Sequence, residues 1–255
     1  MGALRRGPMP ERPINEMRFV AKTGFLSREI WLRFFVRGSD RWLRKKWAAL
    51  RTNGLFEPLS KEHAPNVLVL TTKGKVLAKH EGFDPVTRPA IQNLKHDAIL
   101  SSFLLELESL NLLQCWKAEA ELERDVDGTG CGINLARLTK FPDAEIVPKA
   151  SLRNQVLAVE LELTLKSRKR YLDILNRYAG KKNLLGVLFI VGTENIRQAL
   201  IETREKQRFV LYSLPVGVMR LSDWQEKKGD APVSFLNRDI SLLNLMTRLS
   251  DTGGV

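Results

Sequence analysis

The spacing of apolar residues predicts a helical beginning to the chain. Apolar positions recur at helical intervals over residues 12–22, again after Ser27 and again after Ser39. Ser27 is expected to cap the second helix, and Asn53 and Gly54 are expected to end the third. The runs LFEPL and NVLVL then predict two strands joined by SKEHAP, and TTKGKVLAKH predicts a fourth helix. Three helices followed by a β-hairpin is the plan of a winged helix-turn-helix domain.

The periodicity is interrupted in HEGFDPVTRP, where Gly82, Pro85 and Pro89 favour a domain boundary. A second pattern follows, in which helical spacing alternates with short apolar runs. It predicts a helix at 91–113, an edge strand at 115–126, paired strands at 135–148 and 154–165, a helix at 167–179, a strand at 184–192, a helix at 194–206 and a last strand at 208–221. This order predicts an α/β (α+β) fold with a mixed sheet flanked by helices. The expected organisation is a disordered N-terminus at 1–11, the winged helix-turn-helix domain at 12–82, the second domain at 90–247 and a flexible tail at 248–255.

The third predicted helix, SDRWLRKKWAALRTNG, has one apolar and one basic side. At about 100° per residue, Leu43, Trp47 and Leu50 fall together. The opposite side holds the candidate DNA-binding residues Arg41, Arg44, Lys45 and Arg51, to which Lys61 is added at the expected hairpin tip. Arginine and lysine at these positions can reach the phosphates and base edges of a major groove, although a solvated charged face is the simpler alternative. The tryptophans Trp31, Trp42 and Trp47 are expected to fill the core of this domain.

Charge and composition favour the first of these two interpretations. The 255 residues carry a formal charge of +12 with 44% hydrophobic content, which indicates a folded protein with a polyanionic partner. Nucleic acid is the first candidate for this partner and a membrane surface the second. Neither a run of about 20 apolar residues nor an apolar leader is present, so no membrane span is expected and a cytoplasmic location is favoured. Two cysteines without neighbouring Cys or His pairs predict free thiols rather than a zinc ribbon or a disulfide framework.

The stretch QVLAVELELTLKSRKRY carries two carboxylates inside an otherwise apolar strand. Because side chains alternate along a strand, Glu160, Glu162 and Lys166 are expected on one face and the valine and leucines on the other. If the strand is central, an ionised glutamate there costs several kcal/mol unless it is paired or bound to metal. Asp143 and Glu145 share one face of the preceding strand, and pairing of the two strands could bring Asp143 close to Glu160.

Clustered carboxylates of this kind predict a divalent cation, Mg²⁺ or Mn²⁺, with Asp143 and Glu160 as ligands. Such an ion can polarise a phosphodiester and activate a water, while a nearby lysine stabilises the developing charge. Three alternatives remain open: a metal site without turnover, a polar network of unspecified partners, and a solvated sheet face. On a solvated face the two glutamates would pair with Arg137, Lys140 or Lys149.

Two stretches carry a resemblance to known families. FPDA followed by VELELTLKS resembles the core of the PD-(D/E)xK nuclease superfamily, and the whole order, ending with LDILNRY, is similar to the replication-relaxation family of plasmid and mobile-element proteins. The resemblance covers roughly residues 12–215. It implies a restriction-endonuclease-like second domain, with Asp143 as the motif aspartate and Glu160 as the acidic residue of the next strand.

The resemblance departs from the motif at Glu162, which occupies the lysine position. An acidic residue cannot supply the positive charge, so Lys166, Lys169 or Arg170 would have to replace it. The resemblance therefore implies a double-stranded DNA-binding protein of a plasmid or integrative element, acting in transcription control, replication or mobilisation, with a degenerate nuclease-like domain. The alternative is a Mg²⁺- or Mn²⁺-dependent endonuclease that uses Asp143, Glu160 and Lys166. The candidate catalytic residues are therefore Asp143, Glu160, Lys166 and, at the motif position, Glu162. A homodimer, a scaffold for a relaxase, and partnership with other mobile-element or transcription proteins are further expectations.

Overall fold

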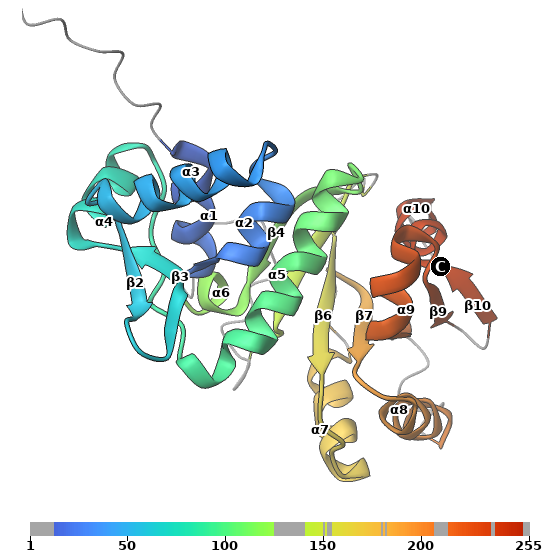
Figure 1. Ribbon diagram of the computed structural model, residues 1–255. Helices are drawn as coiled ribbons and strands as arrows, with labels where there is room; N and C mark the ends of the chain where they lie inside the picture. The colour runs from blue at the N-terminus through green and yellow to red at the C-terminus, as the bar shows by residue number, and fades with distance from the viewer. Residues whose placement is uncertain are drawn as a thin grey trace, which may run out of the picture. The chain divides into compact units, whose positions relative to one another are not determined.

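The computed structural model describes residues 13–124, 141–149, 151, 155–179, 181, 183–206, 214–235 and 238–251 (Figure 1). Residues 1–11 and 252–255, which belong to the expected disordered N-terminus and flexible tail, lie outside this range. The chain divides into two compact units, Met1–Ile91 and Gln92–Val255. The fold is mixed α/β: helices with a small antiparallel sheet make up the first unit, and a mixed sheet flanked by helices makes up the second.

The first unit has the element order that the apolar pattern predicts, with one short strand added. Its strands form a three-stranded antiparallel sheet in the order β1-β3-β2. The elements are α1 (Ile14–Thr23), β1 (Leu26–Ser27), α2 (Arg28–Phe34), α3 (Asp40–Thr52), β2 (Phe56–Ser60), β3 (Ala64–Leu70) and α4 (Thr72–His80). The two-residue strand β1 was not predicted because it has no periodicity of its own, and it exists through its pairing with β3.

Local signals place the helix ends of this unit where the sequence predicts them. The side chain of Ser27 caps α2 by accepting a hydrogen bond from the backbone N–H of Ile30. Helix α3 ends at Thr52, and Gly54 follows with a φ of +75°, a left-handed conformation that glycine adopts at little cost. The chain can therefore turn directly from α3 into β2.

The core of the first unit is built around two of the three tryptophans expected there. The rings of Trp31 and Trp47 lie 5.2 Å apart between centroids, and both are buried together with Met17 and Leu68. The prediction is wrong for Trp42, which is 39% exposed. Its position on α3 falls on the edge of the solvent-facing side rather than beside Trp47, because the two residues are five positions apart.

The second unit contains a seven-stranded sheet in the order β10-β9-β8-β7-β6-β5-β4. The pairs β6–β7 and β7–β8 are parallel, and the remaining neighbours are antiparallel. The strands are β4 (Leu113–Ala118), β5 (Ala144–Pro148), β6 (Val156–Glu162), β7 (Leu184–Val191), β8 (Val216–Arg220), β9 (Pro232–Phe235) and β10 (Arg238–Ser241). The helices are η1 (Ile91–Asn93), α5 (Leu94–Ser109), α6 (Glu119–Arg124), α7 (Arg168–Tyr178), α8 (Glu194–Lys206), α9 (Leu221–Lys227), η2 (Lys228–Asp230) and α10 (Leu242–Asp251).

Helices cover both faces of this sheet. Side chains of α7 and α8 form one buried cluster with alternate residues of the central strands, including Ala158 of β6, Phe189 of β7 and Val218 of β8. On β8 the intervening residue Gly217 faces the other way, and Leu245 of α10 lies 3.7 Å from the position its Cβ would take. The central strands are therefore buried on both sides, which explains their nearly continuous apolar sequence.

The prediction fails in two places of the second unit. The expected edge strand at 115–126 ends at Ala118, because the residues that follow, EAELER, are strong helix formers and build α6. The described part of the strand expected at 208–221 contains β8, and residues 208–213 lie outside the described residues; α9, β9, β10 and α10 after it were not predicted. Strands β9 and β10 have four residues each and α9 has seven, so they carry little periodicity. Helix α10 has ten residues with helically spaced leucines, so its sequence could have predicted it. No helix in the described part of the chain is both long and apolar enough to cross a bilayer.

Candidate functional site

Helix α3 presents a basic face, defined here by Arg41, Arg44, Lys45 and Arg51. All four side chains are exposed, whereas Trp47 and Leu50 on the opposite side are buried and Leu43 is half-buried. The predicted amphipathic helix is therefore confirmed. Lys61, the fifth predicted DNA-binding residue, is exposed in the turn between β2 and β3.

The charges of the basic face are not neutralised within the described residues. None of its four side chains forms an ion pair with a described carboxylate, although Asp40 begins the same helix. By contrast, Arg88 of the same unit pairs with Glu57, and Lys79 lies 3.9 Å from Asp84. A helix face with four uncompensated cations creates a positive potential that attracts polyanions.

The carboxylates of the second unit lie where strands β5 and β6 meet. The two strands pair as predicted, with Ala144 opposite Val159, so that Asp143 comes next to the position of Glu160. Asp143, Glu145, Glu160 and Glu162 are all less than 7% exposed. The alternative of a solvated sheet face is therefore wrong, because these side chains are inside the fold. Arg137 and Lys140 lie outside the described residues.

Asp143 is held by a backbone N–H and by a histidine that the sequence reasoning missed. Its Oδ2 accepts a hydrogen bond of 2.7 Å from the N–H of Leu161 and lies 3.2 Å from His96 Nε2. The other ring nitrogen of His96 lies 3.2 Å from Asp97 Oδ1. Burial lowers the pKa of His96, but the hydrogen bonds and charges of Asp143 and Asp97 together outweigh it and raise the pKa from 6.5 to about 10. His96 is therefore an imidazolium at neutral pH, with both nitrogens donating.

Glu160 accepts a hydrogen bond from a tyrosine that was not predicted to contact it. The hydroxyl of Tyr178, on α7, donates a hydrogen bond to Glu160 Oε1 inside the protein. Burial and the negative charge of Glu160 raise the pKa of Tyr178 above its ordinary value, and Asp143 adds to this effect. The hydroxyl therefore keeps its proton and remains a donor to the buried carboxylate.

Glu162 is paired with Lys166, although not in the expected way. Strand β6 ends at Glu162, so Lys166 lies in the following loop and not on the strand face predicted for it. Its Nζ nevertheless contacts Glu162 Oε1, and its backbone N–H donates to the hydroxyl of Tyr171 at 3.1 Å. Tyr171 thereby fixes the loop that carries the lysine. The other proposed substitutes, Lys169 and Arg170, are exposed in the first turn of α7.

Helix periodicity could have indicated both missed residues. His96 precedes the buried Leu100, Phe103 and Leu107 by four, seven and eleven positions, which places it on the core-facing side of α5. Tyr178 follows the buried Tyr171 by seven positions on α7 in the same way. The sequence therefore contains the information that both side chains point inward, but not which carboxylate each one meets.

The arrangement does not fit a bound metal ion as it stands. Among the described residues, no three acidic, histidine or cysteine side chains converge closely enough to hold a metal ion. Oδ2 of the proposed ligand Asp143 is already engaged by His96 Nε2 at 3.2 Å and by the N–H of Leu161 at 2.7 Å. As described, these side chains form a buried polar network.

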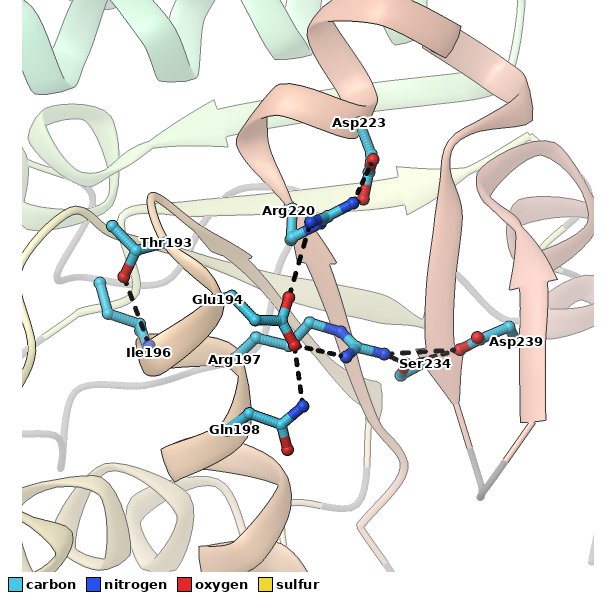
Figure 2. A network of polar contacts seen from close by, with 9 residues as sticks. All are labelled: Thr193, Glu194, Ile196, Arg197, Gln198, Arg220, Asp223, Ser234 and Asp239. Atoms are coloured by element: carbon cyan, nitrogen blue, oxygen red, sulfur yellow. Dashed lines mark hydrogen bonds and ion pairs between the residues drawn. The ribbon is translucent and has the colours of Figure 1, made fainter.

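A separate polar network links the carboxyl ends of β7 and β8 to the strands beyond them (Figure 2). Arg220 donates to both oxygens of Asp223, at 2.7 and 2.9 Å, and the hydrogen bond from Arg220 is the main reason that the pKa of Asp223 is lowered. Glu194 accepts from Arg197 and lies near Arg220, while Arg197 also donates to Ser234 on β9. The charges satisfy one another, so this network fastens α8, β8 and β9 together.

The prediction of free thiols is wrong for Cys115, which lies on β4 and is disulfide-bonded. Cys131 lies outside the described residues. The sequence gives no support for a zinc ribbon, because neither cysteine has a neighbouring Cys or His pair.

Comparisons with protein-family models, with curated protein sequences and with solved structures find no match to this chain. The resemblance to the replication-relaxation family and to PD-(D/E)xK nucleases therefore rests on the quoted motifs alone.

Proposed function

We propose that this protein binds double-stranded DNA through its first unit, with α3 as the recognition helix in the major groove. The observation that carries the proposal is the uncompensated basic face of α3. Its four exposed cations have no acidic partners among the described residues. They can therefore neutralise phosphates or contact base edges without first breaking an ion pair.

The order of elements supports the same proposal. The succession α1-β1-α2-α3-β2-β3, with β1 pairing to β3, is the order expected of a winged helix-turn-helix domain and supports this proposal. In such domains the third helix enters the major groove, and the hairpin can reach the adjacent backbone. Lys61 in the hairpin turn then serves as a phosphate contact.

The second unit has the element order expected of a PD-(D/E)xK core. Helix α5, the antiparallel strands β4, β5 and β6, helix α7 and the parallel strand β7 follow in that sequence, with α6 inserted after β4. We propose a nuclease-like fold without cleavage, because Asp143, Glu160 and Glu162 each have a protein donor as partner. By the resemblance, the biological role is control of transcription, replication or mobilisation in a bacterial plasmid or integrative element.

The test of DNA binding is a titration of a fluorescent duplex of about 20 base pairs with the full chain, followed by anisotropy at several salt concentrations. The combined variant Arg41→Ala, Arg44→Ala, Lys45→Ala should bind more weakly and should flatten the salt dependence by about 0.9 per lost phosphate contact. The matched control removes three exposed cations from α7 instead: Arg168→Ala, Lys169→Ala, Arg170→Ala. Equal losses in both variants would show that net charge, not α3, determines binding.

A plasmid-nicking assay with Mg²⁺ or Mn²⁺ tests the second unit. Retarded mobility without nicking is the expected result. Nicking by the wild type that disappears in Asp143→Asn would replace the non-catalytic proposal with the endonuclease that uses Asp143, Glu160 and Lys166.

A further inference from the structure

One tryptophan differs from all the others in this protein. The sequence has five, and each lies among the described residues. Trp31, Trp47, Trp116 and Trp224 are at most 5% exposed, whereas Trp42 is 39% exposed. An exposed indole is a large apolar surface in contact with water, and it stands in the first turns of the helix that carries the basic face.

The indole of Trp42 is held in place by its surroundings. A Cβ added to Gly38 would lie 2.8 Å from Trp42 Cε3, so the ring is seated against the backbone where this glycine lacks a side chain. The ammonium of Lys46 lies 5.1 Å from the ring centroid, a cation–π distance. A preorganised ring loses little conformational freedom when a ligand covers it.

The neighbours of Trp42 on α3 suit a close approach to a duplex. Lys45 is three positions later and lies on the same side of the helix. Ala48 and Ala49, one turn further, are exposed as well, so the solvent-facing side continues with small side chains. The solvent-facing side of the helix thus combines an aromatic ring, cations near both ends and small side chains between them, a surface that can enter a groove about 12 Å wide.

We propose that Trp42 makes an apolar contact with the floor of the DNA major groove. The apolar group exposed there is the C5-methyl of thymine. The inference rests on the proposed function and adds a specificity-determining residue to it. The cations of the basic face supply the salt-dependent part of binding, and Trp42 supplies a part that does not depend on salt.

The first experiment compares the wild type with Trp42→Ala and Trp42→Phe on an A/T-rich duplex at several salt concentrations. Covering roughly half of the exposed ring predicts that Trp42→Ala weakens binding about tenfold at every salt concentration, with an unchanged salt slope. Trp42→Phe should retain most of the affinity. Unchanged affinity in Trp42→Ala, or a slope reduced as in the Arg41, Arg44, Lys45 variant, would overturn the inference.

A second measurement separates groove contact from other causes of weaker binding. The same duplex is prepared with deoxyuridine in place of thymidine, which removes the C5-methyl groups. The wild type should bind it several-fold more weakly than the thymidine duplex, and Trp42→Ala should discriminate less. Equal discrimination by both proteins would reject the contact.

Two controls keep this inference apart from the proposed function. If the wild type does not bind duplex DNA, the proposed function itself fails. If the wild type binds and the triple cation variant does not, while Trp42→Ala binds like the wild type, only the role of Trp42 fails. If circular dichroism shows that Trp42→Ala folds poorly, a fluorescence measurement takes its place. Subtracting the emission of Trp42→Phe from that of the wild type gives the emission of Trp42, and bound DNA should protect this emission from quenching by acrylamide. Equal quenching with and without DNA would overturn the inference.

Discussion

Raising the pH from 6 to 10 should destabilise the second unit through His96. The pKa of this histidine rises from 6.5 to about 10 in the folded protein because Asp143 and Asp97 outweigh the effect of burial. A raised pKa in the folded state means that the proton binds more tightly there than in the unfolded chain. The stabilisation is therefore complete below about pH 6.5 and is lost as the pH rises towards 10.

The size of the effect follows from the two pKa values. One pKa unit corresponds to about 1.4 kcal/mol, so the difference between 6.5 and about 10 gives a ceiling of roughly 5 kcal/mol. The ring of His96 is 29% exposed and Asp97 is 33% exposed, so solvent screens part of the interaction. We expect a loss of about 2–3 kcal/mol in the free energy of unfolding.

The assay is chemical unfolding of wild type and His96→Gln at pH 6, 8 and 10. Glutamine keeps hydrogen-bonding capacity beside Asp143 but has no proton to lose in this range. Other groups that change protonation between pH 6 and 10 are present in both proteins, so the difference between the two isolates His96. That difference should be largest at pH 6 and should shrink by about 2–3 kcal/mol at pH 10.

Direct titration of the imidazole by nitrogen-15 NMR completes this test. His96 should remain doubly protonated at pH 8, and Asp143→Asn should lower its pKa because one of the two raising carboxylates is gone. A wild type whose His96 loses its proton near pH 6.5, or a stability difference that is constant from pH 6 to 10, would refute the reasoning.

Three further changes test the packing of the same region and of the first unit. Tyr178→Phe should lower the free energy of unfolding by about 1–3 kcal/mol in urea titrations, because the buried Glu160 loses the hydrogen bond from this hydroxyl, and adding Glu160→Gln should restore part of the loss. Lys166→Met should cost about 1 kcal/mol, since the lysine is 30% exposed, and the cost should largely vanish in a Glu162→Gln background. Gly74→Ala should lower the thermal midpoint of the first unit by more than an ordinary helix substitution, because its Cβ would lie 2.2 Å from a backbone oxygen of the segment before β2.

The elements that the sequence predicts well are those with strong local signals. Helix α8 begins and ends where its apolar spacing indicates, and α2 and α7 start at the serine caps Ser27 and Ser167. Strand β7 is a continuous apolar run and is found at the predicted position. In each case the residues of the element itself determine its start, its end and its buried side.

The partners of the carboxylates could not be predicted in the same way. His96 and Asp143 are 47 positions apart in the sequence, and Tyr178 is 18 positions from Glu160. Their contacts depend on how α5 and α7 pack against the sheet, which local spacing does not specify. The sequence therefore indicates that Glu160 needs compensation but leaves open whether a metal ion or a side chain provides it.

The carboxylates of the second unit are paired with protein donors, whereas the cations on α3 form no ion pair among the described residues. This difference favours DNA binding over catalysis. In the second unit, a metal ion at Asp143 Oδ2 or Glu162 Oε1 would first have to displace His96 or Lys166, and the displaced side chain would lose that contact. In the first unit, phosphate meets the basic face of α3 without breaking any ion pair among the described residues. Binding a polyanion there removes mutual repulsion between like charges, whereas binding a cation in the second unit creates it. Favourable ligand binding is therefore expected on α3, and the buried carboxylates are expected to act through the fold.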